Sequence, residues 1–143
     1  IDDDDKLRKS FEKLLGEEGY GVQSAASGES GLEMIQKGIG DVVVLDMRLP
    51  GMNGLETFTA IHEIDPKLPV IMMTAYGTTE TAIEATKMGA FDYLLKPIKL
   101  EDLMVKLGEA FEKKDTHEQK IRKARIKELM RFPGRVFQQE KEE

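Results

Sequence analysis

The feature that most constrains the fold is a run of apolar residues that ends in a carboxylate and leads into a glycine-rich loop. Residues 41–54 read DVVVLDMRLPGMNG, and the β-branched run before Asp46 is typical of a strand buried on both faces. Such strands belong to parallel sheets, in which ligands bind at the carboxyl ends of the strands. Asp46 therefore lies where a carboxylate can act as a nucleophile or metal ligand, or can simply cap the following turn.

The remaining sequence alternates between helical and strand patterns. Strands are predicted over residues 22–26, 41–46, 69–74 and 91–95. Helices are predicted over 4–18, 28–38, 53–64, 78–88 and 100–111, with Asn53 as an N-cap. Strands that alternate with helices through short loops indicate an α/β chain with a doubly wound parallel sheet, covered by helices on both faces.

Three chemically different side chains end three of these strands. Asp46, Thr74 and Lys96 each follow a separate apolar run. Because the carboxyl ends of parallel strands meet at one edge of the sheet, we expect a carboxylate, a hydroxyl and an ammonium group to converge there.

The pattern requires one more strand before the first helix, yet the sequence begins at Ile1. A central strand cannot be missing from a folded sheet without leaving unpaired backbone groups. We expect Ile1 to be the end of that strand and the natural protein to carry further residues before it. The alternative is that residues 135–138 (RVFQ) fill the position, from the same chain or from a neighbouring one.

Four consecutive aspartates follow Ile1, on the same predicted edge as Asp46. Clustered carboxylates repel one another unless a cation lies among them, and oxygen ligands of this kind suit Mg²⁺. Two other interpretations stay open. Asp4 and Asp5 complement the dipole at the start of a helix, and Asp-Asp-Asp-Asp-Lys is also an enterokinase cleavage tag.

Composition narrows the class of protein. Residues 1–111 carry a net charge of −9 and residues 112–143 one of +3, which predicts an acidic domain and a basic C-terminal extension. The absence of cysteine excludes disulfides, thiol nucleophiles and zinc–thiolate sites. No apolar run approaches the roughly 18 residues of a membrane span. His62 and His117 lack partners at a recognised metal-ligand spacing and are predicted to be surface residues.

Four motifs resemble those of response regulator receiver domains in two-component signalling. They are IDDD at 1–4 with Arg8 downstream, LDMRLPGMNG at 45–54, MMTAYG at 72–77 and GAFDYLLKP at 89–97. The residues of these motifs are similar to those in receivers of the nitrogen-regulator type and of sporulation phosphorelays. The resemblance covers residues 1–111 and implies a five-stranded, flavodoxin-like receiver fold whose first strand is largely missing from this sequence.

The resemblance also implies a role for each matching residue. Asp46 would accept a phosphoryl group from a sensor histidine kinase or a phosphotransfer protein, and Thr74 and Lys96 would contact that group. Mg²⁺ would be held by Asp2, Asp3, Asp46 and the backbone carbonyl of Arg48. Thr74 and Tyr93 would form the conformational switch, and the Lys96–Pro97 bond would be cis.

The implied function is a cytoplasmic phosphorylation switch that regulates transcription, and not an enzyme acting on a separate substrate. Phosphorylation would change the surface around residues 78–111, which would bind an output domain, a partner or a second copy of the chain. The alternative is a constitutive binding module that is never phosphorylated. A phosphatase with an aspartate nucleophile is disfavoured, because Arg48 stands where such enzymes carry an acidic residue. Arg48 and Tyr76 flank the site, and as bulky side chains they would shield an acyl phosphate from water.

The basic extension offers two interpretations. Residues 120–131 (KIRKARIKELMR) contain six Lys or Arg and one Glu, which is typical of a solvated helical linker or of an element that contacts nucleic acid. No phosphate-binding loop motif occurs in the sequence. Any contact with nucleic acid would be made through an output domain outside these residues or, less simply, through the extension.

Overall fold

The structure is a computed structural model of the chain, and it describes residues 1–75 and 79–113. The chain divides into two units; the second is Glu112–Glu143, and the first, Ile1–Phe111, contains the sheet. Residues 120–131, the candidate strand at 135–138 and Tyr76 lie outside the described residues.

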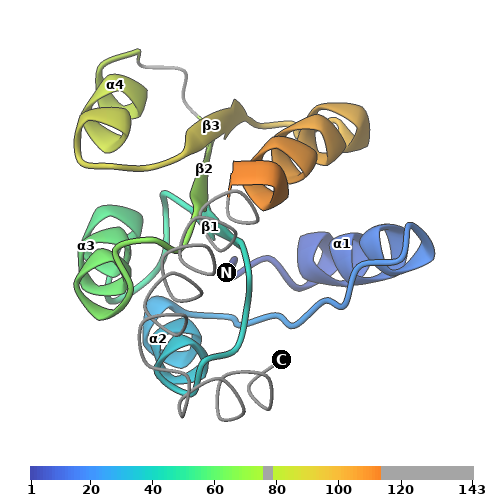
Figure 1. Cartoon of the computed structure of the whole chain (residues 1–143), viewed down its shortest axis with the longest axis horizontal. Coiled ribbons are helices and arrows are strands. Elements are labelled where there is room, and N and C mark those ends of the chain that lie inside the picture. The colour runs from blue at the N-terminus through green and yellow to red at the C-terminus, as the bar shows by residue number, and fades with distance from the viewer. Residues whose placement is uncertain (76–78, 114–143) are drawn as a thin grey trace, which may run out of the picture. The chain divides into compact units, whose positions relative to one another are not determined.

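A parallel three-stranded sheet forms the centre of this unit (Figure 1). Its strands are β1 (Val43–Asp46), β2 (Val70–Thr74) and β3 (Asp92–Leu95), in the order β1-β2-β3. Asp46 is in register with Met73, and Thr74 with Leu95, so the strands end at a common edge. The predicted parallel sheet and the predicted convergence of strand ends are thereby confirmed.

Three of the helices begin directly after residues that cap them. They are α1 (Asp5–Glu17), α2 (Gly28–Gln36), α3 (Gly54–Ile64), α4 (Thr79–Lys87) and a helix over residues 100–113. The side chains of Asp4, Ser27 and Asn53 accept hydrogen bonds from backbone N–H groups in the first turns of α1, α2 and α3. No helix in the described part of the chain is long and apolar enough to cross a bilayer.

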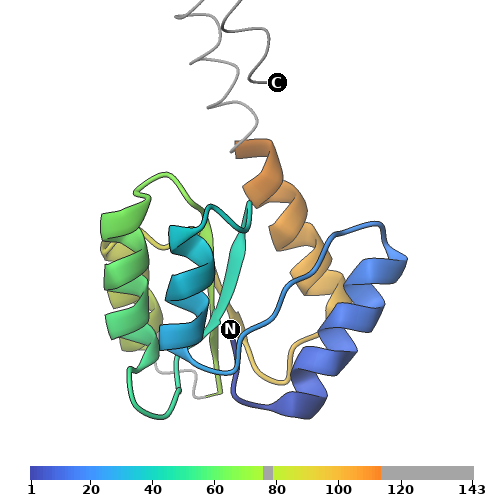
Figure 2. The same ribbon diagram turned by 90° about the horizontal axis from the view of Figure 1, so that it is seen from below.

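The helices lie on both faces of the sheet (Figure 2). The 100–113 helix and α1 cover one face, while α2 and α3 cover the other. Alternate residues of β2 point to opposite faces, so Met72 packs with Leu45 and Phe58, whereas Ile71 packs with Leu103 and other residues of the second core. Every residue of β2 is buried, as a central parallel strand requires.

Ile1 occupies the position predicted for the end of a further strand. Its terminal amine donates to the Val44 carbonyl (2.7 Å), and its carbonyl accepts from the Asp46 N–H (2.9 Å). On its other side, the Asp2 N–H donates to the Ala25 carbonyl (3.1 Å). Ile1 and Asp2 therefore lie between β1 and the segment that contains Ala25.

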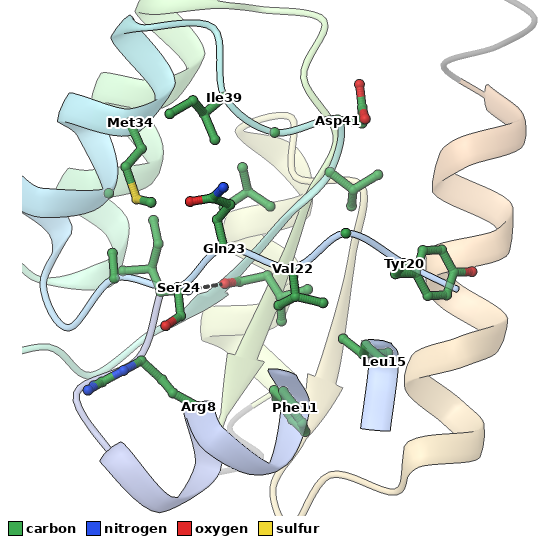
Figure 3. A pocket seen from close by; sticks show the side chains of 18 of the residues that line it. Arg8, Phe11, Leu15, Tyr20, Val22, Gln23, Ser24, Met34, Ile39 and Asp41 are labelled. Atoms are coloured by element: carbon green, nitrogen blue, oxygen red, sulfur yellow. Dashed lines mark hydrogen bonds between the residues drawn. The ribbon is translucent and has the colours of Figure 1, made fainter. Parts of the chain in front are cut away.

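The segment over residues 22–26, predicted to be a strand, differs in the structure. This segment runs alongside the sheet without forming a strand ladder. The reason is that this segment has little backbone to pair with. Ala25 accepts one hydrogen bond, from the Asp2 N–H, and the residues before Ala25 border a cavity of about 260 Å³ (Figure 3). Apolar side chains from both sides line this cavity, among them Ile1, Phe11, Val22, Met34 and Val44.

Candidate functional site

Asp46 is buried at the carboxyl end of β1, with 4% of its surface exposed. One carboxylate oxygen, Oδ1, accepts a hydrogen bond from the Arg48 backbone N–H at 3.0 Å. The other, Oδ2, lies 3.0 Å from the Lys96 ammonium. A neutral donor and a cation thus hold the two oxygens in a fixed orientation.

The loop after Asp46 is held against the strand by a close backbone approach. Gly54, the first residue of α3, donates its N–H to the Met47 carbonyl at 3.1 Å. A Cβ atom at Gly54 would lie 2.5 Å from both the Asp46 carbonyl oxygen and the Met47 Cα. The absence of a side chain at this position is what allows α3 to start directly beside the buried carboxylate.

Asp2 and Asp3 complete a group of three carboxylates. Asp2 is 2% exposed, its Oδ1 accepts from the Asp4 N–H (2.8 Å), and its Oδ2 lies 3.2 Å from the Lys96 ammonium. Asp3 is exposed. One carboxylate oxygen from each of Asp2, Asp3 and Asp46 lies within 4.8 Å of the others. The three predicted metal ligands are therefore brought together.

Burial and hydrogen bonding act in opposite directions on the pKa values of Asp46 and Lys96. Burial raises the pKa of Asp46, and the hydrogen bonds from the Arg48 N–H and from Lys96 offset only part of that effect. Burial alone would lower the pKa of Lys96, but its hydrogen bonds to Asp46 and Asp2 outweigh this and raise it. The Lys96 ammonium therefore lies between two carboxylates that favour its charged form.

Thr74 and Lys96 end the two neighbouring strands. Thr74 is 7% exposed at the end of β2, and its carbonyl accepts the Lys96 N–H at 2.7 Å. The Lys96–Pro97 peptide bond is cis. Tyr93 lies on β3, opposite Met72, and packs partly buried against the core beneath α2 and α3. The Arg48 side chain is exposed.

The donor set fits a hard divalent cation. Oxygen atoms from three carboxylates meet at one place, which is the ligand chemistry that Mg²⁺ prefers, and the exposed position of Asp3 leaves one side open to water. The Lys96 ammonium pairs with two of the three carboxylates, Asp2 and Asp46.

Two contributors to the site were not predicted from the sequence. Glu29, in the first turn of α2, accepts a hydrogen bond from the Met52 N–H at 3.1 Å and so ties down the loop after Asp46. Gly54 supplies the close approach described above. Neither residue carries a local signal of this role, although the Asn53-Gly54 pair marks the loop itself.

Comparisons with known proteins agree on one family. Residues 1–108 match the response regulator receiver domain. The chain is 40% identical over 110 residues to the transcriptional regulatory protein ZraR of Escherichia coli K12, covering 77% of this chain and 25% of that protein. It is 37% identical over 112 residues to GlrR of the same strain, with 78% and 25% covered. The chain thus spans about a quarter of the length of these relatives.

Solved structures give the same result. A response regulator receiver domain protein from Clostridium thermocellum superposes with a TM-score of 0.77 at 34% identity, covering 81% of this chain and 94% of that one. NtrX from Brucella abortus, solved in complex with ATP, has a TM-score of 0.77 at 31% identity, covering 82% and 27%. With Asp46, the acidic pair and Lys96 placed at one edge of the sheet, the chain belongs to the family of response regulator receiver domains.

Proposed function

We propose that this chain accepts a phosphoryl group on Asp46 from a sensor histidine kinase or a phosphotransfer protein. The observation that carries the proposal is the buried Asp46 carboxylate, held by Lys96 beside two further carboxylates. Hydrogen bonds from Lys96 and from the Arg48 N–H favour the charged form of this carboxyl group. A carboxylate in that form needs no general base to act as a nucleophile.

The transfer is an in-line displacement. An Asp46 carboxylate oxygen forms a bond to phosphorus while the bond from phosphorus to the donor nitrogen or oxygen breaks, which leaves an acyl phosphate. The Lys96 ammonium, 3.0 Å from Asp46 Oδ2, then neutralises charge on the phosphoryl oxygens. Thr74, at the end of the adjacent strand, donates its hydroxyl to the same group.

A divalent cation belongs to this proposal. Asp2, Asp3, Asp46 and the Arg48 backbone carbonyl would hold Mg²⁺, which would neutralise negative charge on the transferred group. The chain then promotes its own phosphorylation and dephosphorylation and turns over no separate substrate.

The proposed output is a change in the surface around residues 78–111. Four of the five large hydrophobic side chains exposed in the described residues lie there, namely Ile83, Met88, Leu95 and Val105. In this proposal Thr74 and Tyr93 carry the change from the phosphorylated edge of the sheet to this surface. Thr74 ends β2, and Tyr93 lies on the neighbouring strand β3. An output domain, a partner protein or a second copy of the chain would bind it. The relatives ZraR and GlrR are transcriptional regulatory proteins, which favours control of transcription as the final effect.

The test is a mass measurement. The chain is incubated with acetyl phosphate with and without Mg²⁺, alongside Asp46→Asn as the matched control. A Mg²⁺-dependent gain of one phosphoryl group in the wild type, absent from Asp46→Asn, supports the proposal. If circular dichroism shows a folded protein that gains no phosphoryl group, the constitutive binding module becomes the better description.

A further inference from the structure

We propose that Arg8 is a positioning residue for the acidic pocket, which is the group of carboxylates from Asp2, Asp3 and Asp46. Its guanidinium group holds the backbone at Asp2, which orients the Asp2 and Asp3 carboxylates toward Asp46 and sets the affinity for a divalent cation. The inference rests on the proposed function, because that function gives the pocket its cation.

The guanidinium group of Arg8, which lies on α1, makes two contacts. Arg8 Nη1 donates to the Asp2 main-chain carbonyl at 2.6 Å, and Nη2 pairs with the Asp5 carboxylate in the first turn of the same helix. The Arg8 side chain is only 17% exposed. It therefore has a defined conformation, and it joins the helix to the strand end that carries the pocket.

The bond to the Asp2 carbonyl acts on Asp3 as well. That carbonyl belongs to the peptide plane between Asp2 and Asp3, so fixing its direction also fixes the start of Asp3. Asp2 has other restraints, since its N–H bonds to Ala25 and its carboxylate to the Asp4 N–H and Lys96. Asp3 is exposed and lacks the restraint that burial gives to Asp2, so its orientation depends more on this peptide plane.

Charge and position predict opposite effects of removing Arg8. A cation near the three carboxylates competes with a bound divalent cation, so loss of the charge alone would tighten binding. Loss of the hydrogen bond to the Asp2 carbonyl would let the ligands spread and would weaken binding. The sign of the change therefore separates the two roles. Lysine can keep one of the two contacts but cannot reproduce the planar fork.

The experiment is a calorimetric Mg²⁺ titration of the chain without phosphodonor. Outer-shell partners of metal ligands typically change affinity by about 10–100-fold, so we expect Arg8→Ala to raise the Mg²⁺ Kd by about tenfold. Arg8→Lys is expected to recover part of this loss. Lys9→Ala removes an exposed positive charge from the next position of α1 and is expected to leave the Kd unchanged.

A second variant separates position from general stability. Leu15→Ala removes a buried side chain of α1 distant in sequence from the pocket, and it should lower Tm without changing the Mg²⁺ Kd. An unchanged or tighter Kd in Arg8→Ala overturns the proposal, as does an equal weakening in Leu15→Ala. If the wild type gains the phosphoryl group but Arg8→Ala binds Mg²⁺ with an unchanged Kd, only the role of Arg8 is overturned. A wild type with neither Mg²⁺ binding nor phosphoryl gain overturns both proposals.

Discussion

Gly54 gives the sharpest test of how the strand that ends in Asp46 is held. In Gly54→Ala the new methyl group would lie 2.5 Å from the Asp46 carbonyl oxygen and from the Met47 Cα, and 2.8 Å from the Met47 carbonyl carbon. These atoms belong to the backbone of β1 and the turn after it, so no side chain can rotate away. The start of α3 must shift outward, together with the loop that carries Arg48.

The expected loss can be worked out from this geometry. Overpacking typically costs about 1–3 kcal/mol, and the upper end applies because the contacts are with backbone. The better helix propensity of alanine offsets at most about 1 kcal/mol of this. The free energy of unfolding should therefore fall by about 2 kcal/mol, which lowers Tm by roughly 10 °C for a domain of this size.

Gly108→Ala is the matched control. Gly108 lies within the helix over residues 100–113, is exposed, and a Cβ atom there would meet no atom within 4 Å. The same substitution should therefore raise the free energy of unfolding by about 0.5–1 kcal/mol. Thermal unfolding followed by circular dichroism measures both variants, and the rate of acetyl phosphate modification reports displacement of Asp46. If both variants shift Tm in the same direction, the close-approach argument for Gly54 is wrong.

Three further predictions use the same assays. A Cβ atom at Gly28 would overlap the buried Thr57 hydroxyl, so Gly28→Ala should lower Tm, and Thr57→Ala should restore part of the loss; additive effects would contradict this contact. Burial raises the pKa of Asp46 above the value it has in the unfolded chain. The contribution of Asp46 to the free energy of unfolding is therefore present below the unfolded pKa and is lost as pH rises through the folded pKa. In metal-free buffer, Asp46→Asn should therefore raise Tm at neutral pH and give a smaller gain in acid, and an equal gain at both pH values would refute this cause. The Lys106–Asp92 ion pair is partly exposed, so Lys106→Met should change stability by less than about 1 kcal/mol; a larger loss would mean that the lysine has a packing role.

The sequence was a good guide to the site wherever the signal is local. An apolar run that ends in Asp46, Thr74 or Lys96 marks a parallel strand, and the common edge follows from the topology. Asn53 was recognisable as a cap because capping depends on residues three positions apart.

Contacts between distant segments were not predictable in this way. The bond from Met52 to Glu29 joins residues 23 apart, and it depends on how α2 and α3 pack. The strand predicted over 22–26 failed for a related reason: a pattern of residues shows the tendency to form a strand, but a ladder needs a neighbour along its whole length. Ile1 and Asp2 provide that neighbour at one end only.

The ion pairs of Lys96 have a consequence for folding. The lysine meets Asp46 across 50 positions of sequence and Asp2 across 94, so the contact closes a loop that contains most of the domain. Contacts of such high separation cost more loop-closure entropy than local ones, so they depend on the intervening elements being in place. A nascent or partly unfolded chain has an ordinary solvated aspartate at position 46 and cannot assemble the reactive group. If Asp46 accepts a phosphoryl group as proposed, competence to receive a signal is coupled to completion of the fold, and immature chains stay outside the signalling pool.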